Sequence, residues 1–164
     1  MPNTRVYTGS DGSMTLSVPS SPEGDAAKGI LDTYELITVG RVQDVVVEVH
    51  SEVLPFNEIG QRYPTELRPG NVSVTGTIGR AFVNGAMLKL CLGEAAESRP
   101  PRSWTQPAFN ITLAVENSAV PGVRSTLTLH DVKIERFTLT MPEQAFVGEN
   151  MRFQALFVSV QDEG

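Results

Sequence analysis

The chain of 164 residues is long enough for one domain with a substantial core, and its 40% hydrophobic and 20% charged residues are typical of a globular protein rather than a disordered one. A net charge of -6 at pH 7 argues against a nucleic-acid-binding protein, because phosphate binding depends on clusters of Lys and Arg. The only cysteine, Cys91, has no partner for an internal disulfide and is interpreted as a small buried apolar residue.

The first part of the chain has the composition of an exposed arm. Residues 1–35 are rich in Gly, Ser, Pro and Asp, and one short strand is expected within them at 14–18. The N-terminus has no apolar stretch typical of a secretory signal, and no run approaches the ~18 apolar residues that span a bilayer. We therefore expect a loop-rich arm and then a single domain over 36–164, in a protein that stays in the cytoplasm unless it leaves within an assembly.

A strand predicted at 42–49 has one apolar and one acidic face. Val45 and Val47 fall on one parity, whereas Asp44 and Glu48 fall on the other, which is the pattern of a half-buried strand. Paired carboxylates on one face of a sheet also occur in hydrolases, but no apolar pocket residues accompany this pair. An acidic surface is therefore the preferred interpretation.

Residues 51–70 combine loop-forming residues with large apolar ones. Three prolines and two glycines interrupt the segment, which predicts a long loop. Long loops in compact domains are usually functional, and exposed apolar clusters mark partner surfaces. An interaction role is favoured over a loop that folds back on its own core. The large apolar residues are Leu54, Phe56, Ile59, Tyr63 and Leu67.

The next stretch predicts a strand and then a helix. Alternation predicts the strand from 72 to about 82, with one apolar face and one face of small hydroxyl residues. Apolar spacing predicts the only clear helix at about 84–92, begun by Asn84 and ended by Gly93. The expected core residues of the strand are Val72, Val74 and Ile78, and the hydroxyl face holds Ser73, Thr75 and Thr77.

The rest of the chain predicts further strands. Two alternating segments lie at 109–117 and 124–134, and a shift of apolar parity after Ile134 predicts either a β-bulge near Glu135 and Arg136 or a break into two strands. The last segment, 151–160, is apolar on both faces, which predicts a cover supplied by a neighbouring subunit. Together these elements predict a mainly β fold, an antiparallel β-sandwich or barrel with one short α-helix.

The sequence offers little evidence of catalysis. It contains no phosphate-binding loop, no dinucleotide fingerprint and no nucleophile elbow. His50 and His130 are not accompanied by the Cys or acid clusters of a metal site. No enzyme activity, catalytic residue, metal or cofactor is therefore predicted.

A family resemblance rests on three consecutive pieces of sequence: the loop EVLPFNEIGQRYPTEL, the strand PGNVSVTGTIGRAF and the helix VNGAMLKLCLG. In this order they resemble the tail tube proteins of bacteriophages and of related contractile injection particles. The strand VGRVQDVVVEV before them and the segment STLTLHDVKIERFTLTMPEQAFVGENMRFQALFVSV after them fit the same pattern. The resemblance covers most of the chain from Gly40 onward, whereas the first 35 or so residues match only loosely.

The resemblance implies a structural protein of the virion tail, assembled in the cytoplasm of the bacterial host. Such proteins form homohexameric rings that stack into a hollow tube, and their inner strands join into one continuous barrel. DNA or an effector passes through the lumen without specific binding, and no membrane is involved. Besides further copies of itself, the implied partners are sheath, baseplate, tape-measure and tail terminator proteins.

The resemblance also assigns roles to residues. The residues expected to face the lumen are Asp44, Glu48, Ser73, Thr75 and Thr77. The loop 51–70 is expected to reach a neighbouring ring or subunit, through Leu54, Phe56, Asn57, Glu58, Ile59, Tyr63 and Leu67.

Other functions remain as alternatives. One is the inner tube of a phage-like contractile injection system. Another is a β-sandwich that binds carbohydrate or protein, for which Trp104 and a few Tyr and Phe residues are available. A third is a hydrolase that uses Asp44, Glu48 and a histidine.

Overall fold

The computed structural model describes residues 5–117, 119, 120 and 122–163, and it is mainly β with two α-helices in this part of the chain. This confirms the predicted fold class. The strands are β1 (Gly12–Ser17), β2 (Val42–Phe56), β3 (Glu66–Ala81), β4 (Phe109–Glu116), β5 (Arg124–Thr140), β6 (Gly148–Ala155) and β7 (Phe157–Glu163), and the helices are α1 (Pro22–Tyr34) and α2 (Ala86–Leu92).

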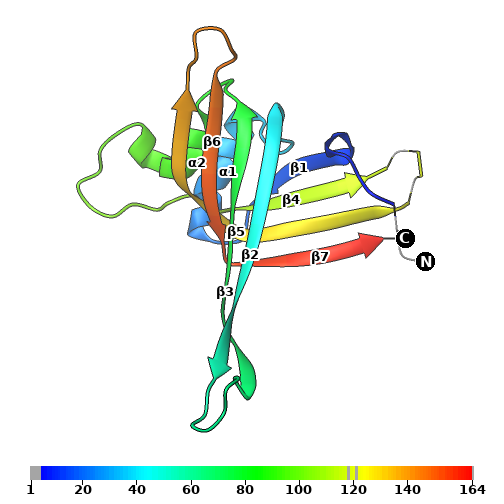
Figure 1. Ribbon diagram of the computed structural model, residues 1–164. Coiled ribbons are helices and arrows are strands. Elements are labelled where there is room, and N and C mark those ends of the chain that lie inside the picture. The colour runs from blue at the N-terminus through cyan, green and yellow to red at the C-terminus, as the bar shows by residue number, and fades with distance from the viewer. Residues whose placement is uncertain (1–4, 118, 121, 164) are drawn as a thin grey trace.

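The strands form one continuous antiparallel sheet that divides along the long strand β5 (Figure 1). We call its two parts sheet A and sheet B. Sheet A has the order β1–β4–β5–β7 and uses the first half of β5. Sheet B has the order β5–β6–β3–β2 and uses the second half of β5. In Figure 1 the strands of sheet A run roughly horizontally and those of sheet B run roughly vertically.

The division between the sheets follows from local breaks in two neighbouring strands. β5 bends at Asp131, whose φ is 52° and whose N–H donates to Asn110 Oδ1 at 3.0 Å. The segment that pairs with β5 is interrupted at the facing position, where Leu156 separates β6 from β7. The register also shifts between Ile134 and Arg136, which confirms the predicted bulge. The two halves of β5 can therefore belong to sheets with different directions.

One apolar core lies between the two sheets and the helices. Sheet A contributes Phe109 and sheet B contributes Phe153, and both side chains are fully buried. Cys91 of α2 is also buried, and its Sγ lies 3.4 Å from the Ile134 carbonyl oxygen. Burial raises the pKa of the Cys91 thiol. The prediction that Cys91 is a small buried residue is confirmed.

α2 ends at Gly93 as the sequence predicted, but its N-cap is Gly85 rather than the predicted Asn84. The N–H of Ala86 donates to Asn84 Oδ1 at 3.1 Å, so the asparagine satisfies one of the first backbone donors. The helix ends at Gly93, whose φ of 62° is easily adopted only by glycine. Met87 and Leu90 point into the core, which holds this short helix in place.

The prediction that 1–35 is loop-rich beyond one strand is wrong for residues 22–34, and its first four residues lie outside the described part of the chain. These residues form α1, whose N-terminus is capped by Ser21, because its Oγ accepts the Gly24 N–H at 3.0 Å. Ala27 and Leu31, one turn apart, are buried in the core. Two glycines and a proline in the segment concealed the helix. The Ser-Pro start followed by two acids was the signal that could have revealed it.

The predicted loop 51–70 is mostly strand. Residues 51–56 continue β2 and residues 66–70 begin β3, so only 57–65 connect them. Pro55 and Pro69 are tolerated because in this part of the hairpin β2 and β3 pair only with each other, which leaves each of them a free edge. Val72, predicted to be in the core, is 62% exposed. The core face of β3 begins only at Val74, where β6 starts to pair with it.

Candidate functional site: assembly surfaces

The face of sheet B that points away from the core carries all five residues predicted to face the lumen. Strand register pairs Asp44 with Gly79 and Glu48 with Thr75, so their side chains lie on one face. Ser73 and Thr77 lie on the same face, opposite His50 and Val46. We call this surface the polar face. It comprises Asp44, Val46, Glu48, His50, Ser73, Thr75, Thr77, Lys133, Glu135, Arg136, Thr138, Asn150, Arg152 and Gln154.

Gly79 provides room for the side chain of Asp44 on the polar face. A Cβ atom placed on Gly79 would overlap Asp44 Oδ1, so a larger residue here would require this carboxylate to move. The glycine in the alternating strand is therefore explained by close approach of a neighbouring side chain rather than by a turn.

Sequence reasoning missed the basic residues of the polar face. Strand register adds Arg152 from β6 and Arg136 from β5. Glu135 accepts hydrogen bonds from Gln154 Nε2 at 2.6 Å and from Arg152 Nε at 2.7 Å, and these bonds hold the pKa of Glu135 below its usual value. The polar face therefore has its unpaired acids on β2 and its bases toward β5. The alternation of apolar and polar residues over 148–155 was the signal that could have assigned Arg152 to an exposed strand face.

The β2–β3 hairpin extends beyond the rest of sheet B. β3 pairs with β6 only from Val74 onward, so residues 66–73 pair with β2 alone. At about 3.4 Å per residue this free part is roughly 25 Å long. We call residues 49–73 the arm; it projects at the bottom of Figure 1. Nearly every side chain of the arm is exposed, although an isolated two-stranded hairpin is at best marginally stable in water.

The arm carries most of the predicted contact residues on exposed apolar positions. Ile59 is fully exposed and Tyr63 is 77% exposed, both in the connection between the strands. Monomeric proteins seldom expose a contiguous apolar patch of this kind without a binding function. The exposed large apolar residues of the arm are Val49, Val53, Leu54, Phe56, Ile59, Tyr63, Leu67 and Val72.

Sheet B also has two open edges. β2 pairs only with β3 and presents its other edge along all 15 residues. On the opposite side, residues 133–140 of β5 pair with β6 but not with β4. Open strand edges are templates for pairing with another chain. Both sides of sheet B are therefore available for a neighbouring copy.

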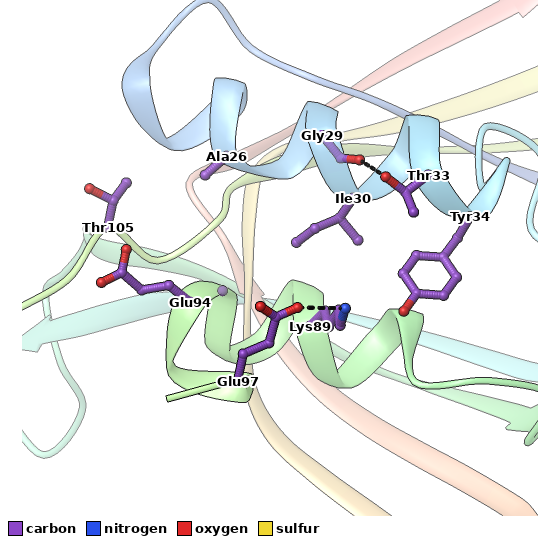
Figure 2. Close-up of a pocket in the computed structure, with 10 residues that line it drawn as sticks. Ala26, Gly29, Ile30, Thr33, Tyr34, Lys89, Glu94, Glu97 and Thr105 are labelled. Atoms are coloured by element: carbon purple, nitrogen blue, oxygen red, sulfur yellow. Dashed lines mark hydrogen bonds and ion pairs between the residues drawn. The ribbon is translucent and has the colours of Figure 1, made fainter. Parts of the chain in front are cut away.

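A groove of about 360 Å³ lies between α1 and α2, on the helical side of the core (Figure 2). Lys89 Nζ donates to Glu97 Oε1 at 2.8 Å and lies 5.5 Å from the centre of the Tyr34 ring. The hydrogen bond to Glu97 raises the pKa of Lys89 and lowers that of Glu97. Ile30 is directed into the groove from α1. The groove is an open surface feature with apolar and charged walls.

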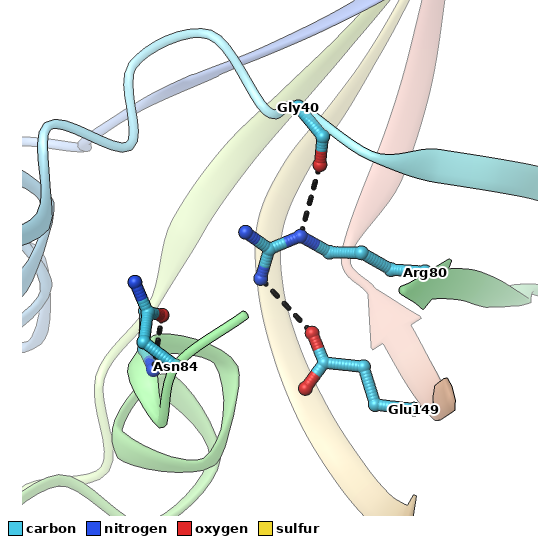
Figure 3. Close-up of polar contacts among 5 residues, drawn as sticks. Gly40, Arg80, Asn84 and Glu149 are labelled. Atoms are coloured by element: carbon cyan, nitrogen blue, oxygen red, sulfur yellow. Dashed lines mark hydrogen bonds and ion pairs between the residues drawn. The ribbon is translucent and has the colours of Figure 1, made fainter. Parts of the chain in front are cut away.

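A buried ion pair fixes the end of sheet B where β6 begins (Figure 3). Arg80 Nη1 lies 2.9 Å from Glu149 Oε1, and Arg80 Nε donates to the Gly40 carbonyl at 3.0 Å. The two side chains are 5% and 0% exposed. Burial raises the pKa of Glu149, whereas Arg80 opposes the rise. Glu149 Oε2 has no hydrogen-bond partner among the described residues, so the carboxylate depends on Arg80.

Of the two histidines, His130 is held by its neighbours on β7. The His130 ring stacks on Phe157 with 4.1 Å between centroids, and its Nε2 lies 2.9 Å from Ser159 Oγ. Among the described residues, no group of three or more His, Cys, Asp or Glu side chains is placed to hold a metal ion. None of the helices in the same residues is both long and apolar enough to cross a membrane.

No protein-family model matches the sequence, and no curated protein matches it either. Solved structures do match. A chain in the sheath–tube complex of the extracellular contractile injection system PVC has a TM-score of 0.65 at 11% identity, over 97% of this chain and 93% of that chain. A chain in the tube-terminating cap of the anti-feeding prophage has a TM-score of 0.66 at 10% identity, over 99% and 95%.

The tail tube of SPP1 matches with a TM-score of 0.60 at 12% identity, over 96% of this chain and 80% of that chain. Three matches, each covering at least 96% of this chain, thus come from a tail tube, a sheath–tube complex and a tube-terminating cap. The chain therefore has the fold of tail tube proteins, which confirms the fold that the sequence resemblance implied.

Proposed function

We propose that this chain is a structural, non-catalytic tail tube subunit of a phage or of a phage-like contractile injection particle. Homohexameric rings stack into a hollow conduit that delivers DNA or an effector into the host cell. The observation that carries this proposal is the arm, a two-stranded ribbon about 25 Å long that is exposed on both faces and carries eight exposed large apolar residues. Such a ribbon needs contacts with other chains, and the tail tube fold provides them through its assembly.

The geometry of sheet B supports closure into a ring. Its strand order is β5–β6–β3–β2 with every pair antiparallel, so its two edge strands run in opposite directions. The β2 edge of one copy can therefore pair antiparallel with the β5 edge of the next, and this repeats for any number of copies. Asp44 and Glu48 near one edge and Arg136 at the other give this contact complementary charges.

In such a ring the polar face lines the lumen. Small hydroxyl residues line β3, and Arg152 is engaged by Glu135, so few cations remain free to hold phosphates. The acids of β2 repel DNA, which favours passage without capture. The helical side then faces outward, where α1, α2 and their groove are available to a sheath. Baseplate, tape-measure and tail terminator proteins are the further proposed partners, all in the virion tail.

The first prediction concerns assembly. Negative-stain microscopy of the purified chain should show rings or tubes, and Phe56→Asp or Ile59→Asp should abolish the tubes while leaving the subunit folded. A charge at either position opposes its transfer from water into an apolar contact. Phe56→Leu, which remains apolar, is the matched control and should still form tubes. A strictly monomeric wild-type chain under all conditions would contradict the proposal.

The second prediction concerns the lumen. Tubes assembled from Asp44→Asn/Glu48→Gln in the presence of short DNA should protect several-fold more DNA from nuclease than wild-type tubes, because two repulsive charges per subunit are lost. Glu94→Gln/Glu97→Gln removes equal charge from the helical side and should leave protection unchanged. Equal protection by all three tubes would show that Asp44 and Glu48 do not line the conduit.

A further inference from the structure

The end of sheet B opposite the arm carries a second exposed apolar cluster. Phe146 is 89% exposed and Met141 is 71% exposed, both in the turn that joins β5 to β6. The N–H of Phe82 donates to the Val147 carbonyl at 2.9 Å, which places the end of β3 beside this turn. We call this cluster the β5–β6 end; it comprises Phe82, Val83, Leu139, Met141 and Phe146.

A single chain cannot bring the arm and the β5–β6 end together. Ala81 pairs with Gly148 at one end of the sheet, whereas Phe56 pairs with Glu66 at the other. The 15 residues of β2 span the distance between them, which is about 50 Å at ~3.4 Å per residue. In Figure 1 the arm and the β5–β6 turn project in opposite directions. Only another molecule can therefore cover either cluster, and exposed apolar clusters of this kind mark partner surfaces.

The two ends are complementary in charge as well as apolar. Arg62 lies between Ile59 and Tyr63 at the tip of the arm, and Glu143 lies between Met141 and Phe146 in the opposite turn. Both charged residues are exposed, and within the described residues neither of them makes an ion pair. A second copy of the chain thus offers an apolar surface and an opposite charge to each end.

Building on the proposed tube function, we propose that the tip of the arm docks onto the β5–β6 end of a chain in the next ring. Ile59 and Tyr63 pack against Met141 and Phe146, and Arg62 pairs with Glu143. Because the two surfaces differ and lie at opposite ends of the molecule, the contact is heterologous. Every added ring exposes a fresh set of arms, so this contact stacks rings without limit.

Cross-linking in assembled tubes tests this contact. A short bismaleimide should link Ile59→Cys/Phe146→Cys chains into a ladder of dimers, trimers and longer species on a denaturing gel. Each single-cysteine variant and the wild type, whose Cys91 is buried, should give no ladder. Ile59→Cys/Gln161→Cys, with its second cysteine exposed on β7, is the matched control and should give none either. Tyr63→Cys/Glu143→Cys provides a second pair at the same contact.

A surface variant gives a readout that is independent of cysteine geometry. Phe146→Asp should yield rings but no tubes, whereas Phe146→Leu should yield tubes of wild-type length. Visible tubes in which neither cysteine pair gives a ladder, or normal tubes from Phe146→Asp, would overturn the docking contact and leave the tube function standing. Absence of rings and tubes from the wild type would overturn the tube function itself.

Discussion

Replacing Arg80 with methionine is expected to lower the free energy of unfolding by about 3–5 kcal/mol at pH 7. Glu149 is fully buried, its Oε1 bonds Arg80 and its Oε2 has no other hydrogen-bond partner. Removal of the guanidinium leaves a carboxylate without compensation inside the protein. Urea unfolding should be measured in the Ile59→Asp background, so that ring stacking does not add to the apparent stability, and at one chain concentration for all variants.

The loss of unfolding free energy caused by Arg80→Met should become smaller in acid. Arg80 supplies the charge and the hydrogen bond that lower the pKa of Glu149, so without it burial raises that pKa further. The folded state then binds more protons than the unfolded state between pH 4.5 and the raised pKa. In that window the free energy of unfolding falls as pH rises, and the loss is complete above it. Lowering the pH from 7 toward 4.5 should therefore recover stability.

An exposed ion pair of the same chemistry is the matched control. Arg152 lies 2.7 Å from Glu135, but their side chains are 48% and 38% exposed, so Arg152→Met should cost about 0–1 kcal/mol. The double variant Arg80→Met/Glu149→Leu should regain most of the lost stability, because no buried charge remains. An Arg80→Met deficit as small as that of Arg152→Met would refute this account of the buried pair.

The sequence predicted correctly those elements in which the hydrophobic periodicity agrees with the residues that begin or end the element. The strand at 42–49, the core residues Val74 and Ile78 and the helix that ends at Gly93 were found because alternation, helical spacing and cap residues all gave the same answer. α1 was missed because its glycines and low apolar content outweighed the cap at Ser21. Its stability comes from tertiary packing, which no local pattern shows.

The sequence predicted only a part of the candidate surfaces, and the reason is related. Parity within one strand was enough to group Asp44 with Glu48, and Ser73 with Thr75. That Arg152 and Arg136 share their face depends on which strands are neighbours, and sequence order does not give this because β3 pairs with β6 rather than with β4. Prolines made the arm look like a loop, since local signals do not reveal a strand that has a free edge.

A methyl group added at Gly76 is expected to destabilise the subunit by about 3 kcal/mol, near the upper end of typical overpacking costs. Gly76 lies in the middle of sheet B, paired with Val47 on one side and Phe153 on the other. A Cβ there would overlap the Val46 carbonyl oxygen and lie 2.5 Å from Phe153 Cζ. The phenyl ring is fully buried, so it cannot move without disturbing the core.

Gly29→Ala is the matched control for Gly76→Ala. Gly29 lies in the interior of α1, and a Cβ there has no atom within 4 Å, so alanine should stabilise the protein by up to about 1 kcal/mol. Urea unfolding in the same Ile59→Asp background, at one chain concentration, measures both variants. Two glycines should then change stability in opposite directions, because one gives space to a buried ring and the other only adds flexibility to a helix. A Gly76→Ala protein as stable as the wild type would mean that Phe153 does not rest against β3.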